Sequence, residues 1–253
     1  MRKIRVAALA AATLLACTTP SALAAEQDEN WQYGSATFYG GADGSGTTGE
    51  ACGYGNLNED LPGELTTAVS TALFQNGANC GARFKVRCER SSWCLPGQPE
   101  VTVVVTTLCP PNWYLPSDNG GWCNPPRRHF DLSQPAYSRI AEIRSGIVPI
   151  SFAEADADST APMRYTMNGI PGVNRLSVIS NSRWPVKQVS IKGTNTGWLP
   201  MFRTQGIIFT TAALLQGQAL SIKVVDTHDR TVISNDVFPA NWSFGQTVTA
   251  PGF

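Results

Sequence analysis

Two short segments of the chain carry the side chains best suited to acid–base or hydrogen-bonding chemistry. In one, His129 lies beside Asp131, a carboxyl that could act as a general acid or bind a sugar hydroxyl. In the other, Thr37 and Tyr39 alternate along a predicted strand, which would direct two hydroxyls to the same face. Asp131 also lies two residues before a predicted helix start at Ser133, so a capping role is the alternative interpretation.

Other kinds of chemistry find little support in the sequence. The chain has two histidines and no G-x-S-x-G motif, which argues against a Ser-His-Asp hydrolase. It has no phosphate-binding loop and no dinucleotide fingerprint, so we expect no cofactor. Cys109, Cys123 and His129 could be interpreted as zinc ligands, but the chain has no C-x-x-C pair, and we expect no metal.

The composition limits the class of protein. The 253 residues include 19 Lys and Arg against 19 Asp and Glu, only 15% are charged, and 42% are apolar. These values exclude a disordered tail protein, a coiled coil and a highly charged helical bundle. Because no excess of basic residues exists to displace counterions from phosphates, we expect no nucleic acid among the partners.

The first 24 residues have the features of a secretory signal peptide. Three basic residues within the first five are followed by a short apolar run and an Ala-x-Ala cleavage signal at Ala22–Ala24. The run is too short to span a membrane and no later stretch reaches that length, so we expect a secreted, extracellular protein. Leu14–Cys17 also resembles a lipoprotein cleavage box, and the alternative is a protein anchored through a lipid on Cys17.

Six cysteines remain after removal of that peptide, all within 72 positions. An even, clustered set in an exported chain indicates disulfides, and six cysteines allow 15 connectivities. The six are Cys52, Cys80, Cys88, Cys94, Cys109 and Cys123.

The first of two predicted domains covers residues 25–153. It is rich in Cys, Gly and aromatic residues, and Val101–Thr107 is a β-branched run typical of a buried strand. The Pro- and Gly-rich segment 109–128 is expected to be a long structured loop. Ser133–Ser145 is the best helix candidate, because Ser133 can cap it and apolar residues share one side.

The second predicted domain covers residues 163–253 and is separated from the first by a small, acidic linker at 154–162. It consists of short alternating strands and turns with no convincing helix, a pattern that predicts a small β-sandwich. The expected fold class is therefore mainly β.

Nine motifs along the chain resemble, in order and spacing, those of plant-type α-expansins. The resemblance covers nearly all of the mature chain, and the combination of motifs is specific. The motifs are residues 31–41 (WQYGSATFYGG), 51–56 (ACGYGN), 70–77 (STALFQNG), 93–97 (WCLPG), 109–112 (CPPN), 120–126 (GGWCNPP), 129–135 (HFDLSQP), 193–198 (GTNTGW) and 242–247 (WSFGQT).

The resemblance implies a six-stranded double-ψ β-barrel followed by an immunoglobulin-like β-sandwich that binds cellulose. Proteins of this family loosen cell walls under acid conditions by disrupting noncovalent contacts between cellulose and matrix glycans, without hydrolysis. The implied partners are therefore cellulose and matrix polysaccharides of the xyloglucan kind. We expect the protein to be a monomer and not an enzyme.

The implied binding groove is centred on Asp131, with Thr37, Tyr39 and His129 around it. The barrel is similar to family-45 glycoside hydrolases, inverting enzymes that need an acid and a base about 6.5–9.5 Å apart. Asp131 matches the acid, whereas Thr107 takes the strand end where related proteins carry Asp or Asn, so we expect no hydrolysis. The alternatives are a cryptic endoglucanase and a wall-binding module that has lost loosening activity. A substitute base would be Asp43, Glu50 or Asp118.

The chain departs from the family pattern at two cysteine positions. Arg83 stands where α-expansins have a cysteine, and the last cysteine of their first domain, near Asp156, is also missing. Two losses that would be partners fit the removal of one disulfide, at an expected cost of about 2–5 kcal/mol. The remaining pairs implied by the resemblance are Cys52–Cys80, Cys88–Cys94 and Cys109–Cys123.

The family pattern also implies aromatic residues on a flat face of the second domain, where their rings stack on pyranose rings. Trp198 is retained, and Phe202 and Phe209 are the further candidates for carbohydrate binding. Two later tryptophans of the pattern appear here as Gln205 and Phe209. Phe209 lies in an apolar run, so a core position is its alternative interpretation.

Overall fold

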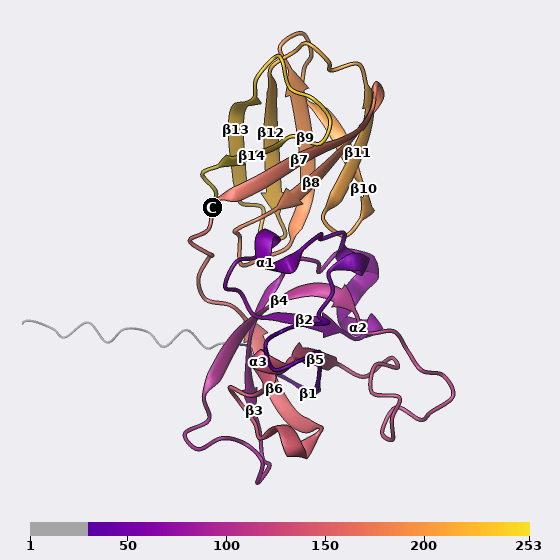
Figure 1. The fold of residues 1–253 in the computed structure, drawn as a ribbon, viewed down its shortest axis with the longest axis vertical. Helices are drawn as coiled ribbons and strands as arrows, with labels where there is room; N and C mark the ends of the chain where they lie inside the picture. The colour runs from indigo at the N-terminus through magenta and orange to yellow at the C-terminus, as the bar shows by residue number, and fades with distance from the viewer. Residues whose placement is uncertain (1–29) are drawn as a thin grey trace, which may run out of the picture.

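The computed structural model describes residues 30–253, which form two β domains stacked end to end (Figure 1). The predicted signal peptide and Cys17 lie outside the described residues. The first domain contains the strands β1 (Gln32–Tyr39), β2 (Thr66–Val69), β3 (Arg83–Cys88), β4 (Glu100–Leu108), β5 (His129–Ser133) and β6 (Val148–Glu154), the helices α1 (Leu57–Asp60), α2 (Thr71–Phe74) and α3 (Gln134–Tyr137), and 3₁₀ turns at Glu50–Cys52, Gln75–Gly77 and Ile143–Ser145.

The six strands of the first domain close into a barrel in the order β1-β5-β2-β4-β3-β6. β1 pairs with β5 and β2 pairs with β4 in parallel, and the other neighbours are antiparallel. Parallel neighbours cannot be joined by a tight hairpin, so the chain crosses the barrel between them. Phe130 and Phe152, with ring centroids 4.9 Å apart, lie in the buried interior.

The helix expected over Ser133–Ser145 is wrong in length. α3 ends at Tyr137, and residues 140–142 exchange two backbone hydrogen bonds with residues 93–95. Those bonds occupy backbone groups that a longer helix would need. Asp131 lies inside β5 and makes no capping bond, so the capping interpretation is also wrong.

The second domain is one eight-stranded sheet folded into two layers, as the predicted sandwich requires. The order is β13-β12-β9-β10-β11-β8-β7-β14. β10 pairs with β9 through its first residues and with β11 through its last, so both layers share it. The expected mainly-β class, a barrel followed by a sandwich, is therefore confirmed. The strands are β7 (Met163–Ile170), β8 (Gly172–Ile179), β9 (Val186–Gly193), β10 (Leu199–Gln205), β11 (Ile208–Ala213), β12 (Leu220–Asp226), β13 (Thr231–Phe238) and β14 (Thr247–Ala250).

Three disulfides lie in the first domain, with the pairing that the family resemblance implied: Cys52–Cys80, Cys88–Cys94 and Cys109–Cys123. The third closes the base of the loop 109–128, which projects from the side of the barrel (Figure 1). Within this loop the Asn124 side chain bonds to the backbone of Asn112 and Leu115. These bonds hold the loop in one shape although it contains no helix or strand.

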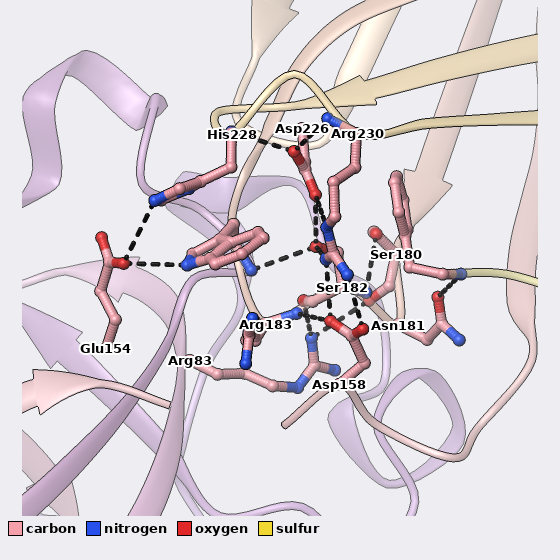
Figure 2. Close-up of polar contacts among 12 residues, drawn as sticks. Arg83, Glu154, Asp158, Ser180, Asn181, Ser182, Arg183, Asp226, His228 and Arg230 are labelled. Atoms are coloured by element: carbon pink, nitrogen blue, oxygen red, sulfur yellow. Dashed lines mark hydrogen bonds and ion pairs between the residues drawn. The ribbon is translucent and has the colours of Figure 1, made fainter. Parts of the chain in front are cut away.

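A polar interface joins the two domains (Figure 2). Arg83 is only 4% exposed, forms a 2.8 Å ion pair with Glu64 of the barrel and donates a 2.6 Å hydrogen bond to the carbonyl of Ser182 in the sandwich. Arg230 donates to both oxygens of Asp158, at 2.8 and 2.9 Å, and so ties the segment between the domains to the sandwich. The position of the missing cysteine is therefore occupied by a side chain that bridges both domains.

Residues 30–253 contain neither a membrane-spanning helix nor a cluster of metal-binding side chains. None of their helices is both long enough and apolar enough to cross a membrane. Their His, Cys, Asp and Glu side chains form no group of three or more that could hold a metal ion.

Candidate functional site

The residues predicted to carry chemistry in the first domain come from two parallel strands, β1 and β5. Their register places Thr37 opposite Asp131 and Ser35 opposite His129. Because Ala36 points into the buried core, its neighbours along β1 point to the opposite face. The sequence motifs 35–39 and 129–131 thus meet on one face of the barrel. We call Thr37, Tyr39, His129 and Asp131 the Asp131 site.

Asp131 is half-buried and is held by one hydrogen bond. The Thr37 hydroxyl donates to its Oδ1 at 2.6 Å, whereas Oδ2 receives no hydrogen bond from any described residue. Burial raises the pKa of the Asp131 carboxyl above its ordinary value, and the bond from Thr37 partly opposes this rise. The carboxyl therefore takes up a proton more readily in mild acid than an exposed aspartate does.

His129 is fully buried and does not face the solvent. Its Nδ1 lies 2.8 Å from the Ser35 hydroxyl and its Nε2 lies 2.8 Å from the Thr37 hydroxyl. Burial, together with the charge on Arg127, lowers the pKa of His129 to about 3, so the ring is neutral above that pH. The prediction that His129 lines a glucan groove is wrong in this respect, because the ring contacts Thr37 and not the surface.

Tyr39 lies on the same face of β1 as Thr37, as the alternation predicted. Its hydroxyl is buried beside Thr48 and Thr106 without a hydrogen bond of normal geometry. Burial raises the pKa of the phenol, so it stays neutral in acid. Tyr39 therefore adds no negative charge to the site, and its buried hydroxyl does not reach the solvent in this structure.

No second carboxyl joins the site among the residues that the structure describes. Thr107 lies beside Ala68, which in turn lies opposite Asp131, so the strand end that would carry a base carries a hydroxyl. The candidate replacements are exposed on turns and loops of the described chain, and none bonds to a residue of the Asp131 site. Hydrogen bonds from Ser45 also hold the pKa of one of them, Asp43, below its ordinary value. These candidates are Asp43, Glu50 and Asp118.

In the second domain, Trp198 directly precedes β10 and is partly exposed, and Phe202 lies within β10. Phe202 is 70% exposed, and Met201 between them points into the core. The ammonium groups of Lys192 and Lys223 lie 5.4 and 5.1 Å from the Trp198 ring centroid. Trp198 therefore lies beside β9 and β12 and Phe202 beside β11, and both rings lie outside the sandwich core.

The prediction of Phe209 as a sugar-stacking ring is wrong. Phe209 is 1% exposed and packs in the sandwich core, so the alternative interpretation holds. Gln205, the other position where the family pattern has a tryptophan, donates a hydrogen bond to the backbone of Glu50 in the barrel. It belongs to the domain interface.

Two residues linked to the Asp131 site, one directly and one through the other, were not predicted. Ser35 extends the alternation of Thr37 and Tyr39 by one step, and that spacing could have identified it. Arg127 donates to the Ser35 hydroxyl at 2.9 Å. No sequence signal indicated this contact, because it depends on the path of the loop 109–128.

Both domains of the chain match known families. A family model described as lytic transglycolase matches residues 66–152, and a model of the expansin C-terminal domain matches residues 164–239. Expansin-A25 of Oryza sativa subsp. japonica is 42% identical over 244 residues, covering 94% of this chain and 95% of its own length. Expansin-A7 of Arabidopsis thaliana is 40% identical over 219 residues, covering 86% of this chain and 83% of its own.

Two solved structures share the fold. The apo expansin of Clavibacter michiganensis matches with a TM-score of 0.66 and 22% identity, over 88% of this chain and 96% of that chain. A mutant of that expansin in complex with cellohexaose matches with a TM-score of 0.62 and 21% identity, over 87% and 96% of the two chains. With relatives about 40% identical along most of its length, this chain belongs to the expansin family.

Proposed function

We propose that this protein loosens cell walls by disrupting noncovalent contacts between cellulose and matrix polysaccharides such as xyloglucan, without hydrolysis. The observation that carries the proposal is the single carboxyl of the Asp131 site. Inverting hydrolysis needs a second carboxyl that activates water on the opposite face of the sugar. A site with one carboxyl and neighbouring hydroxyls can exchange hydrogen bonds with a glucan but has no base for that step.

We expect the loosening activity to depend on pH through the Asp131 carboxyl. An ionised carboxylate only accepts hydrogen bonds, whereas the neutral acid both donates and accepts. Burial raises the pKa of Asp131, so the neutral form gains population in mild acid. In that form Oδ2 can donate to a glucan oxygen that would otherwise bond to a neighbouring polymer. Thr37 holds Oδ1 meanwhile.

The second domain is the proposed cellulose anchor. Trp198 and Phe202 supply two rings outside the sandwich core, and an apolar ring can stack on the flat face of a pyranose. The Clavibacter michiganensis expansin complex with cellohexaose supports a glucan ligand for this fold. The Asp131 site in the barrel and the two rings in the sandwich would then act on the same wall.

The proposed protein is exported and has two domains joined by a linker. Cleavage after Ala24 would release a secreted monomer with a barrel domain at 25–153, a linker at 154–162 and a sandwich at 163–253. Three disulfides in the barrel suit an oxidising extracellular compartment.

The test is creep of a heat-killed plant wall strip under constant load at acid pH, with the bath assayed for released sugar. We expect extension without sugar for the wild type and no extension for Asp131→Asn, with cellulose binding unchanged. Asp118→Asn, an exposed carboxyl on a loop of the same domain, is the matched control and should extend the strip normally. Extension with released sugar would make the protein an endoglucanase. Binding without extension would make it a wall-binding module.

A further inference from the structure

A continuous line of hydrogen bonds runs from Arg127 to Asp131. Arg127 Nε lies 2.9 Å from Ser35 Oγ, Ser35 Oγ lies 2.8 Å from His129 Nδ1, His129 Nε2 lies 2.8 Å from Thr37 Oγ1, and Thr37 Oγ1 lies 2.6 Å from Asp131 Oδ1. Ser35 and His129 are 4% and 0% exposed, so water does not substitute for these contacts. The line connects the loop 109–128 to the Asp131 site.

The chemistry of the two ends fixes the direction of every bond. A guanidinium only donates, and a carboxylate only accepts. Thr37 therefore gives its one hydrogen to the Asp131 carboxylate, so it must accept from Nε2–H of His129. The neutral ring then has no proton on Nδ1, which accepts from Ser35, and Ser35 accepts from Arg127. Each group between the two ends gives one hydrogen and accepts one.

Protonation of Asp131 could change the direction of these hydrogen bonds. A proton on Oδ1 could be donated inward to Thr37, and each bond of the line would then reverse. The reversed line requires Nδ1–H of His129 to donate to Ser35, and the Ser35 hydrogen would need an acceptor beyond it. Arg127 stands at that place and offers only N–H groups. Reversal would therefore leave the buried Ser35 hydrogen without an acceptor at the Arg127 end, and that loss of a hydrogen bond disfavours it.

We propose that Arg127 and Ser35 are positioning residues that act through His129 and Thr37 to place the proton of neutral Asp131 on Oδ2, where it meets the ligand. The inference rests on the proposed function only in assigning Oδ2 to the glucan. The order of the hydrogens itself requires no ligand.

The loop holds Arg127 in place for this role. Its Nη1 donates to the carbonyl of Ser117 at 2.9 Å, and its guanidinium lies 5.0 Å from the centroid of the Trp122 ring. The Cys109–Cys123 disulfide closes the same loop. The loop that projects from the barrel therefore has a defined link to the carboxyl.

The groups around Asp131 leave few other proton acceptors. On β1, Asp131 faces Thr37 and Tyr39, and the raised pKa of Tyr39 keeps its phenol neutral. On its own strand, β5, Asp131 lies two residues from His129. From β2 the opposite residue is Ala68, which does not titrate. The Asp131 titration therefore depends mainly on burial and on the bond from Thr37.

The experiment is nuclear magnetic resonance of the full secreted chain, following the His129 ring nitrogens and the Asp131 carboxyl carbon through the Asp131 titration. In the wild type we expect His129 to remain the Nε2–H tautomer on both sides of that titration. In Arg127→Gln, whose amide can accept from Ser35, we expect a change to Nδ1–H as Asp131 becomes neutral, and a higher Asp131 pKa. Arg127→Lys keeps a donor and should restore the wild-type tautomer.

Arg128→Gln is the control, because it removes the same charge from the neighbouring, exposed arginine. It should leave the tautomer unchanged and shift the Asp131 pKa less than Arg127→Gln does. Equal behaviour of Arg127→Gln and Arg128→Gln would overturn the proposal. A wild-type His129 that carries its proton on Nδ1 would overturn it without any variant. Neither readout uses a wall, so failure of the creep assay with an unchanged tautomer would count against the proposed function alone.

Discussion

Arg83 donates a 2.6 Å hydrogen bond to the carbonyl of Ser182, and this contact joins the barrel to the sandwich. The backbone of Arg83 also crosses the interface, since its N–H donates to the carbonyl of Arg183 at 3.0 Å. The carbonyl of Arg83 accepts from Ala155, next to the position of the second missing cysteine. A charged, noncovalent bridge between domains therefore occupies the place where the family resemblance implied a disulfide.

Replacing this arginine should cost far more stability than replacing an exposed one. Arg83→Met removes the partner of the half-buried Glu64 and leaves two carbonyls without their donor, so we expect a loss of about 3 kcal/mol in the free energy of unfolding. Arg144→Met is the matched control, because Arg144 also pairs with a glutamate but is 71% exposed, and it should cost less than about 1 kcal/mol. Urea unfolding of the two variants measures the difference. Similar losses would show that Arg83 does not stabilise the interface.

The ion pair between Asp158 and Arg230 should make stability depend on acid. Hydrogen bonds from Arg230 lower the pKa of Asp158 to about 2, below its value in the unfolded chain. The pair therefore contributes stability above about pH 4, and this contribution is lost as the pH falls towards 2. We expect Asp158→Asn to lose about 1–2 kcal/mol at pH 6, allowing for solvent screening, and the gap from wild type to close near pH 2.

Asp229→Asn serves as the control for that experiment. Asp229 pairs with Lys187 on the surface and is 74% exposed, so its removal should have little effect at either pH. A gap for Asp158→Asn that stays constant between pH 6 and pH 2 would contradict the assignment.

The two aromatic residues Trp198 and Phe209 should separate binding from stability. Trp198→Ala removes a partly exposed ring that lies outside the core, so we expect at least about tenfold weaker cellulose binding with only a small change in unfolding. Phe209→Ala empties a core position and should cost about 3–5 kcal/mol in unfolding, with affinity retained by the folded fraction. Cellulose pull-down and urea unfolding of both variants measure the two effects. Loss of affinity in the folded fraction of Phe209→Ala would return Phe209 to the binding face.

The strands could be predicted because their signals are local: the β-branched run at 101–107 and the alternation of Thr37 and Tyr39 are typical of β structure. The meeting of Thr37 with Asp131 joins distant segments, and only the family resemblance implied it. The side of β11 occupied by Phe209 depends on its register with β10 and β8, which the residues of one strand do not encode. For the same reason the sequence alone could not distinguish Phe202, which is exposed, from Phe209, which lies in the core.

The remaining errors arise from contacts between distant segments. Residues 140–142 have helix-forming neighbours, but their backbone bonds to residues 93–95 and the helix stops early. Arg127 reaches Ser35 across 92 positions, at the end of a loop whose path a disulfide fixes. Such contacts are tertiary, and no periodicity in the sequence represents them.

The last prediction concerns the disulfide that closes this loop. Replacing Cys109 and Cys123 together by serine releases the base of the loop 109–128, so Arg127 should lose its fixed position beside Ser35. The chain-entropy cost for a loop of this size is about 3 kcal/mol, which a folded domain can tolerate. We expect a folded protein that binds cellulose normally, shows weaker wall creep, and allows His129 to change tautomer when Asp131 is protonated.

The control is the double serine variant of Cys88 and Cys94, a bridge with a sequence separation of 6 that closes a different loop. This variant should lose some stability but keep the wild-type His129 tautomer through the Asp131 titration, because none of the bonds that hold Arg127 comes from that loop. If both double variants keep the tautomer and the creep rate, the loop 109–128 does not control the carboxyl. If both lose them equally, the effect is one of general stability. Only a difference between the two bridges supports a specific link from the loop to Asp131.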